Sequence, residues 1–261
     1  MAIITLTSDW RHDDFYVGAI KGYIYSNCPN ARVVDITHDI NRLEKDSTAF
    51  IIRGAYKHFP KNSIHIICTN GEVSEKKPPL CFFYDNHYFI GSNTEAFKIM
   101  FDYQPEKIIC LDPLKYELST FPELTFFAHA ACQLANGESI DNLGFDASEI
   151  YAPFHLQPIN NPNSITAHIL HIDSYKNIIT DLSLNFFKNT WNQRKYEIVL
   201  SANFRTNKIC RTYSDVENGT FLALFNSLGL LELAIRNGEL ATMASIKEGH
   251  HIVTINFKDN D

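Results

Sequence analysis

Two hydrophobic periodicities alternate along the first half of the sequence, and this alternation constrains the fold more than any other feature. Buried strands are predicted where β-branched apolar runs occur, at residues 2–7, 31–37 and 62–69. Between these runs, apolar residues recur at helical spacing, at residues 14–24 and 45–59. Strands that alternate with helices predict a parallel sheet covered by helices on both faces. A later helix is expected at residues 129–137, with Gly137 at its C-terminal cap.

The second half of the sequence has a different pattern. Residues 156–165 are rich in Asn and Pro, which is typical of a linker or turn region. Beyond them, short β-like runs recur at roughly ten-residue intervals, and this spacing predicts an antiparallel barrel or sandwich. We therefore expect two domains, with a boundary near residue 155.

Composition narrows the class of ligand and the location. The 261 residues are 45% hydrophobic and 20% charged, with a formal net charge of −7. An acidic chain without basic clusters lacks the electrostatic footprint of a nucleic-acid or acidic-membrane partner, so a small-molecule ligand is expected. No apolar run approaches the length that spans a bilayer, and the start lacks a basic leader segment, so we expect a cytoplasmic protein. Six cysteines without CxxC spacing are expected to be reduced, buried thiols.

The stretch "SDWRHDDF" supplies the first candidate site. Asp9 follows the first predicted strand, and open α/β sheets bind ligands at the carboxyl ends of their strands. A carboxylate there can accept two hydrogen bonds from vicinal hydroxyls such as those of a ribose. The alternative is that Asp9 or Asp13 caps a helix that begins near Asp14, where acidic groups are favoured by the helix dipole.

A metal site is a further alternative. Asp9 with His12, and Asp35 with His38, share a DxxH spacing, and their oxygen and imidazole ligands could converge from two strand ends. A metal-dependent hydrolase is therefore kept as an option, although no metal is expected. The glycine-rich nucleotide-binding patterns, the GxSxG elbow and the HExxH motif are absent from the sequence.

Four segments together resemble a known family. They are "SDWRHDDFYVGAIKG" at residues 8–22, "VVDITH" at 33–38, "IDSYKNIITDL" at 172–182 and "FNSLGLLELAIRNGELA" at 225–241. They are similar to the marked segments of the S-adenosylmethionine hydroxide adenosyltransferase family, relatives of the bacterial fluorinases and chlorinases. The family's opening pattern, Thr/Ser-Asp-Phe-Gly-x-x-Asp-x-Tyr-Val-Gly-x-x-Lys-Gly, is matched here except that Trp10 and Arg11 replace Phe and Gly.

The resemblance implies both a fold and a ligand. It implies an α/β protein with an N-terminal three-layer α/β/α domain, residues 1–155, and a small antiparallel β-barrel domain, residues 163–261. It also implies a homotrimer in which an adenosyl ligand lies between one subunit's first domain and its neighbour's second, with no further cofactor. By position, the implied contacts are Asp9 to the ribose diol, Tyr175, Asn177 and the Asn237 backbone to adenine, and Asp14 and Ser227 to the methionine end.

The sequence departs from the family at the residues that activate water. The family reaction is displacement by water at the 5′ carbon, aided by an Asp, an Arg and a His. Here Asn70 and Lys77 occupy the Asp and Arg positions; Asn cannot take a proton, and Lys lacks the planar fork of Arg. The family pattern Phe-His-Gly-Arg-Asp-x-Phe-Ala-Pro-Ala-Ala is expected to have lost its His-Gly-Arg-Asp part, with His129 at the Pro position.

Two functions follow from this departure. One is a slower S-adenosylmethionine hydrolase with an altered catalytic set, Asn70, Lys77 and His129. The other is a non-catalytic protein that binds or senses adenosine or an adenosyl compound. Turnover without a cofactor would favour the first function, and saturable binding without turnover would favour the second.

Overall fold

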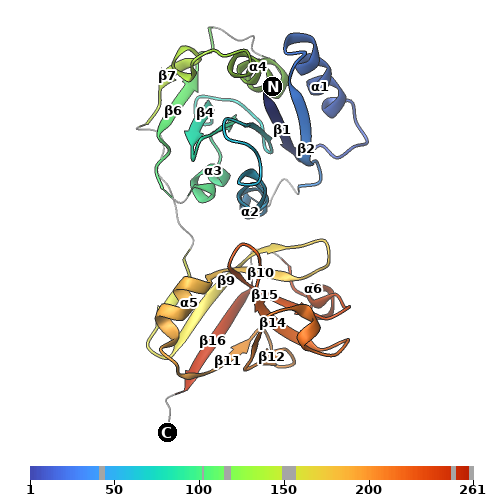
Figure 1. Cartoon of the computed structure of the whole chain (residues 1–261), viewed down its shortest axis with the longest axis vertical. Helices are drawn as coiled ribbons and strands as arrows, with labels where there is room; N and C mark the ends of the chain where they lie inside the picture. The colour runs from blue at the N-terminus through green and yellow to red at the C-terminus, as the bar shows by residue number, and fades with distance from the viewer. Residues whose placement is uncertain (41–44, 102, 115–118, 149–156, 248–250, 259–261) are drawn as a thin grey trace. The chain divides into compact units, whose positions relative to one another are not determined.

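The computed structural model describes residues 1–40, 45–101, 103–114, 119–148, 157–247 and 251–258. It divides into two compact units, Met1–His155 and Leu156–Asp261, and each unit is described here by itself (Figure 1). The expected boundary near residue 155 lies outside the described residues.

The first unit contains a seven-stranded sheet in the order β2-β1-β3-β5-β4-β6-β7. Its strands are β1 (Ile3–Ser8), β2 (Arg32–Thr37), β3 (Ile64–Cys68), β4 (Pro79–Tyr84), β5 (His87–Ser92), β6 (Lys107–Leu111) and β7 (Gly144–Asp146). The expected parallel pairing is confirmed for β2, β1, β3 and β5. The sheet is nevertheless mixed, because β4, β6 and β7 pair antiparallel. A two-residue turn joins β4 to β5, in which Asp85 and Asn86 both have positive φ, 50° and 63°.

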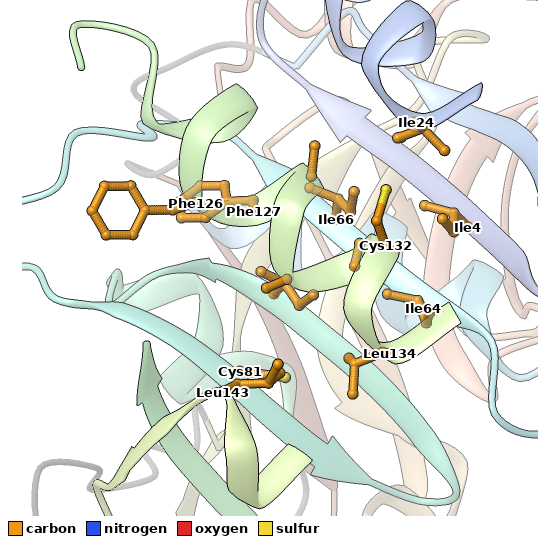
Figure 2. Packing of buried hydrophobic residues seen from close by; sticks show 14 of the residues in the cluster. Ile4, Ile24, Ile64, Ile66, Cys81, Phe126, Phe127, Cys132, Leu134 and Leu143 are labelled. Atoms are coloured by element: carbon orange, nitrogen blue, oxygen red, sulfur yellow. The ribbon is translucent and has the colours of Figure 1, made fainter. Parts of the chain in front are cut away.

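Helices cover both faces of this sheet (Figure 1). On one face lie α1 (Tyr16–Asn27), the π-helix η1 (Glu123–Ala128) and α4 (His129–Ala135), and on the other lie α2 (Lys45–Tyr56) and α3 (Glu95–Met100). Alternate residues of β3 point to opposite faces of the sheet. Ile66 packs in the core under α1, η1 and α4, and Ile67 packs in the core under α2 and α3. Figure 2 shows Cys132 and Leu134 of α4 packed toward the strands. The three-layer α/β/α architecture is confirmed.

The ends of two helices show how local sequence sets their bounds. Gly137, with φ 94°, follows α4, and its N–H donates to Leu134 O while Glu138 N–H donates to Gln133 O. This is a Schellman C-cap, as the glycine predicted. The prediction that Asp9 or Asp13 caps α1 is wrong: the N-cap residue is Phe15, in right-handed helical conformation and without a side-chain capping bond. The turn is closed by the backbone instead, as Ala19 N–H donates to Phe15 O.

The second unit is built on a strongly curved, mainly antiparallel sheet. Its path is β12-β11-β16-β9-β10-β15-β14-β13, with β8 paired to β9. The strands are β8 (Ile159–Asn161), β9 (Ser164–Ile172), β10 (Ile178–Ser183), β11 (Lys195–Val199), β12 (Arg205–Thr206), β13 (Ile209–Cys210), β14 (Phe221–Phe225), β15 (Leu230–Ile235) and β16 (Ile252–Lys258). Because β12, at one edge, also contacts β14 near the other, the sheet curls into a small barrel, as expected. The described helices of this unit are α5 (Leu184–Trp191), the short 3₁₀ helix η3 (Tyr213–Asp215) and α6 (Leu240–Met243).

The cysteines agree with the expectation from composition. All six are unpaired thiols, and all except Cys110 are buried. In the part of the chain that the structure describes, no helix combines the length and apolar character needed to cross a bilayer.

Candidate functional site

Three adjacent parallel strands end together in the first unit and create the candidate site. Ser8, the last residue of β1, is paired with Cys68, the last residue of β3. On the other side, Thr7 of β1 is paired with Thr37, the last residue of β2. The loops after these strands therefore begin at one edge of the sheet, where α/β proteins bind ligands.

Asp9 directly follows β1 at this edge, and its side chain is held by the loop after β3. Asn70 N–H donates a hydrogen bond to Asp9 Oδ2 over 3.2 Å. Asn70 adopts φ 52°, a left-handed conformation that Asn tolerates better than most residues. Within the described residues, Asp9 Oδ1 has no hydrogen bond. The carboxylate is thus oriented through one oxygen and retains acceptor capacity for a ligand.

A polar chain fixes the end of β2 against β1 and α1. His38 Nδ1 is hydrogen-bonded to Ser8 Oγ over 2.7 Å, and Lys21 Nζ donates to Asp35 Oδ2 over 2.6 Å. His38 Nε2 lies 3.2 Å from Asp35 Oδ1, but outside hydrogen-bond geometry. Burial lowers the pKa of His38, although Asp35 opposes this shift, so the imidazole is neutral at pH 7.

Two of the four residues considered for a metal site, Asp35 and His38, belong to this set of polar contacts. His12 is exposed, and its ring meets the edge of the His38 ring at 5.0 Å between centroids. Among the residues that the structure describes, no group of three or more His, Cys, Asp or Glu side chains is arranged to hold a metal ion. Asp35 and His38 therefore belong to the framework that joins β2, β1 and α1.

Glu123, the first residue of η1, is a buried carboxylate at the same edge. Its side chain packs directly on Gly71, because a Cβ built there would lie only 1.9 Å from Glu123 Oε1. Burial raises the pKa of Glu123 to about 7, and the charge of Asp9 adds to this rise. Burial also raises the pKa of the Cys68 thiol, and Glu123 and Asp9 raise it further. Asp9, Glu123 and Cys68 are thus near enough to interact electrostatically.

The continuous helix formed by η1 and α4 changes the interpretation of the family pattern here. Starting from Phe121, the chain fits Phe-His-Gly-Arg-Asp-x-Phe-Ala-Pro-Ala-Ala without a gap, with His129 still at the Pro position. Residues 122–125, "PELT", then replace His-Gly-Arg-Asp instead of following a deletion. Sequence reasoning misses Glu123 when the His-Gly-Arg-Asp part is expected to be lost; this ungapped match is the signal that finds it.

Buried polar atoms without partners gather around the same edge. Five such atoms occur among the described residues: Thr7 Oγ1, His38 Nε2, Ser92 Oγ, Asn93 Oδ1 and Thr125 Oγ1. They lie at or just beyond the carboxyl ends of β1, β2 and β5, and in η1. Native proteins pair nearly all buried polar groups, so such a group calls for a ligand or a bound water. The edge therefore has the character of a polar binding site.

Each of the three predicted catalytic residues has contacts of its own in the first unit. Asn70 meets Asp9 through its backbone. Lys77 lies in a tight turn closed by reciprocal backbone bonds with Ser74, and its Nζ is 3.4 Å from Glu72 Oε2. His129 begins α4, as expected, and its ring lies 6.4 Å from that of Tyr23 in α1.

Of the predicted ligand residues, Asp9 and Asp14 belong to the first unit and the other four to the second. Asp14 is exposed, and its Oδ1 accepts the N–H of Phe15. In the second unit, Asp173 organises the turn before β10 by accepting the N–H groups of Tyr175 and Asn177 and the Asn177 side-chain amide, over 2.8–3.1 Å. Asn177 is buried by this turn, whereas the Tyr175 side chain is 75% exposed.

The remaining two ligand residues lie at opposite ends of β15. Asn237 is exposed, has φ 54° and follows the C-terminal end of β15. That end of β15 pairs with the start of β10, which follows Tyr175 and Asn177, so Asn237 lies near these two residues. Ser227 is exposed in the turn between β14 and β15, at the other end of the strand. The second unit thus brings Tyr175, Asn177 and Asn237 together and places Ser227 apart from them.

Comparisons with known proteins identify the family of the chain. Residues 4–144 match the model of the SAM hydroxide adenosyltransferase N-terminal domain, and residues 167–253 match that of the C-terminal domain. The chain is 27% identical over 250 residues to an (R)-S-adenosyl-L-methionine hydrolase of Methanocaldococcus jannaschii, covering 89% of this chain and 88% of that protein. A hydrolase of the same name from Thermus thermophilus is 22% identical over 262 residues, covering 95% and 98%.

Solved structures support the fold. A conserved protein from Thermotoga maritima, known from its crystal structure, superimposes with a TM-score of 0.84 at 20% identity. The match covers 97% of this chain and 99% of that one. At this identity the likeness concerns the fold alone, and it extends over both units.

Proposed function

The chain belongs to the SAM hydroxide adenosyltransferase family, and from this premise we propose that it hydrolyses S-adenosylmethionine to adenosine and methionine. Water attacks the 5′ carbon of the adenosyl group, the bond from that carbon to sulfur breaks, and the electron pair remains on sulfur. The sulfonium becomes the neutral thioether of methionine, and the proton of the water is released. No redox partner is needed, because the sulfonium is already a good leaving group.

The observation that carries the proposal is the setting of Asp9. Its carboxylate stands at the carboxyl end of β1, oriented by the Asn70 N–H, at the sheet edge where, among the described residues, buried polar atoms without hydrogen-bond partners also occur. A carboxylate that keeps free lone pairs can accept both hydroxyls of a ribose 2′,3′-diol. Such charge-assisted bonds contribute about 1.5–3 kcal/mol each, so Asp9 would supply much of the affinity for the adenosyl group.

The charge of the site suits a sulfonium substrate. Asp9 and Glu123 are carboxylates at the same edge, and Asp14 is exposed just before α1. Opposite charge attracts a cationic ligand and favours it over a neutral one of similar shape. The neutral thioether product would lose this attraction, which favours product release.

The other ligand contacts are part of the proposal. Tyr175, Asn177 and the Asn237 backbone would recognise adenine, and Asp14 and Ser227 would face the methionine end. We also propose the homotrimer with interfacial sites that the family resemblance implies. Size-exclusion chromatography with light scattering measures this directly, and a monomer of about 30 kDa at every concentration would contradict it.

A second candidate function is adenosyl binding without turnover. It is favoured by Asn70 and Lys77, since an amide cannot take a proton and Lys77 is paired with Glu72. In this reading the fold has kept its ligand and lost its reaction.

Incubation of the purified protein with S-adenosylmethionine, followed by chromatography of adenosine and methionine, tests the proposal. Asp9→Ala should weaken adenosine binding by at least about 100-fold in calorimetry, since two charge-assisted hydrogen bonds are lost. Asp13→Ala is the matched control, because Asp13 is exposed in the same loop and should leave binding unchanged. Release of both products supports hydrolysis, and saturable binding without release supports the second function. Equal affinity of Asp9→Ala and wild type would refute the assignment of the ribose site.

A further inference from the structure

We propose that Glu123 is the catalytic base that accepts the proton of the attacking water. This inference rests on the proposed hydrolase function and goes beyond it, because it assigns water activation to a residue outside the set Asn70, Lys77 and His129.

The first support is position. Glu123 Oε1 packs against Gly71, while Asp9 Oδ2 accepts the N–H of Asn70, the residue next to Gly71 in the chain. Neighbouring Cα atoms are about 3.8 Å apart, so the two carboxylates flank a single dipeptide. If Asp9 holds the 2′ and 3′ hydroxyls, the 5′ carbon lies across the sugar ring, within reach of a second group at this edge. Glu123 is placed to be that group.

The second support is burial without a countercharge. Glu123 is only 7% exposed, and among the described residues it has no Lys, Arg or His at ion-pair distance. Removing an ionised carboxylate from water costs several kcal/mol unless it is paired. If the role of this position were purely structural, an amide or an apolar side chain would lower the stability of the fold less than a buried carboxylate does. A buried carboxylate without a countercharge at the binding edge of a sheet is instead typical of an acid–base group.

The third support is the match between Glu123 and its task. A general base works best when its pKa lies near the working pH. Burial and the charge of Asp9 together raise the pKa of Glu123 to about 7, whereas an exposed carboxylate would be a much weaker base. Asn70 cannot serve in this role, because an amide has no basic lone pair at neutral pH.

The fourth support is a place for the water. The hydroxyls of Ser92, at the end of β5, and Thr125, in η1, are buried and have no hydrogen-bond partner among the residues that the structure describes. Buried water molecules occupy sites with two to four polar groups. β5 also packs against η1, so both hydroxyls belong to the part of the unit that carries Glu123.

The step balances without a further reactant. The water oxygen forms a bond to the 5′ carbon as the bond from that carbon to sulfur breaks, and the sulfur keeps the electron pair. One proton of the water passes to the ionised carboxylate of Glu123, which gives adenosine, methionine and a neutral carboxyl group. Loss of that proton to solvent restores the base.

The decisive variant is Glu123→Gln, which keeps the size of the side chain against Gly71 and removes its basicity. We expect kcat to fall by about 10²- to 10⁴-fold, the usual contribution of a general base, with adenosine affinity changed less than about threefold. Glu75→Gln is the matched control, because Glu75 is exposed in the turn after β3 and should keep full activity. In Glu123→Ala, added sodium formate should restore part of the lost turnover by supplying a carboxylate, which a merely structural role would not allow.

The pH profile provides an independent readout. Wild-type kcat/KM should rise with pH through the pKa of Glu123, near 7, and then level off, and this rise should be absent from Glu123→Gln. A Glu123→Gln variant with undiminished kcat would overturn the inference while leaving the hydrolase function intact. A wild type that binds adenosine without turnover would overturn the inference but keep the binding site. Absence of both binding and turnover would refute the proposed function itself.

Discussion

Acid should destabilise the first unit through a pair of buried histidines on the α2 face of its sheet. His65 in β3 is fully buried, with Nδ1 hydrogen-bonded to Thr5 Oγ1 over 2.8 Å and Nε2 to His87 Nδ1 over 3.2 Å. Its ring stacks on Phe89 at 4.9 Å, and Tyr56 packs against its edge. Desolvation by this packing, followed by the neighbouring His87, lowers the pKa of His65 to about 3.

The size of the effect follows from proton linkage. An unfolded chain binds a proton at His65 with the ordinary pKa of 6.5, whereas the folded chain does so only near 3. The stability that this group contributes is complete above pH 6.5 and is lost as the pH falls below that value. Each pH unit in this window costs about 1.4 kcal/mol, so lowering the pH from 7.5 to 4.5 should cost roughly 2.5 kcal/mol through His65 alone. Burial also lowers the pKa of His87, although Asp85 opposes and Lys61 adds to that shift, so the total can be larger.

Urea denaturation at pH 7.5 and 4.5 measures this loss. The informative variant is Thr5→Val/His65→Phe, which keeps an aromatic ring beside Phe89 and leaves no hydroxyl unpaired. Compared with wild type, it should lose roughly 2.5 kcal/mol less between the two pH values. His58→Gln, at an exposed position in the same unit, should behave like wild type. Equal losses in wild type and the double variant would refute the reasoning, because another group would then account for the acid sensitivity.

Two other substitutions test local contacts. Gly71→Ala should displace the Glu123 carboxylate, because the added carbon would lie 1.9 Å from Oε1. We expect the free energy of unfolding in urea denaturation to fall by about 1–3 kcal/mol and turnover to fall more than tenfold. Unchanged turnover would mean that the carboxylate can move without consequence. Ser183→Ala removes the hydroxyl that accepts the Phe186 N–H at the start of α5, and should cost about 1 kcal/mol, whereas Ser183→Asp should retain most of that stability; identical midpoints for the Ala and Asp variants would contradict the capping role.

Sequence periodicity predicts the parallel strands that are covered by helices on both faces of the sheet. The apolar runs that became β1, β2 and β3 are short and flanked by helical patterns, so local sequence and final position agree. β4 was not predicted, because its pairing depends on the two-residue turn at Asp85 and Asn86, whose positive φ values allow an antiparallel hairpin inside an α/β sheet. The strand character of β15 likewise depends on its pairing with β10 and β14, which local sequence does not reveal.

The candidate site also combines a residue whose position could be predicted from sequence with one whose contribution could not. The position of Asp9 could be predicted, because a residue that follows a parallel strand must lie at the binding edge of the sheet. The contribution of Glu123 could not, because its burial and its contact with Gly71 arise only when η1 packs over the loop after β3. Capping of α1 by an acidic residue failed because Phe15 already has helical geometry, so the acidic residues before it lie outside the helix.

The charge of Asp9 and the charge of a bound sulfonium would act on the Glu123 carboxylate in opposite directions. Burial, with a further contribution from the charge of Asp9, raises the pKa of Glu123 to about 7, which makes Glu123 a stronger base but keeps about half of it protonated near neutral pH. A bound sulfonium would have the reverse effect, since a positive charge nearby favours the ionised carboxylate. Substrate binding would therefore convert Glu123 to the form that can accept a proton, and the pKa obtained from kcat should lie below that obtained from kcat/KM. Once the sulfur becomes a neutral thioether this influence ends, so the charge of Asp9 again favours the neutral carboxyl group that Glu123 has become by accepting the water proton.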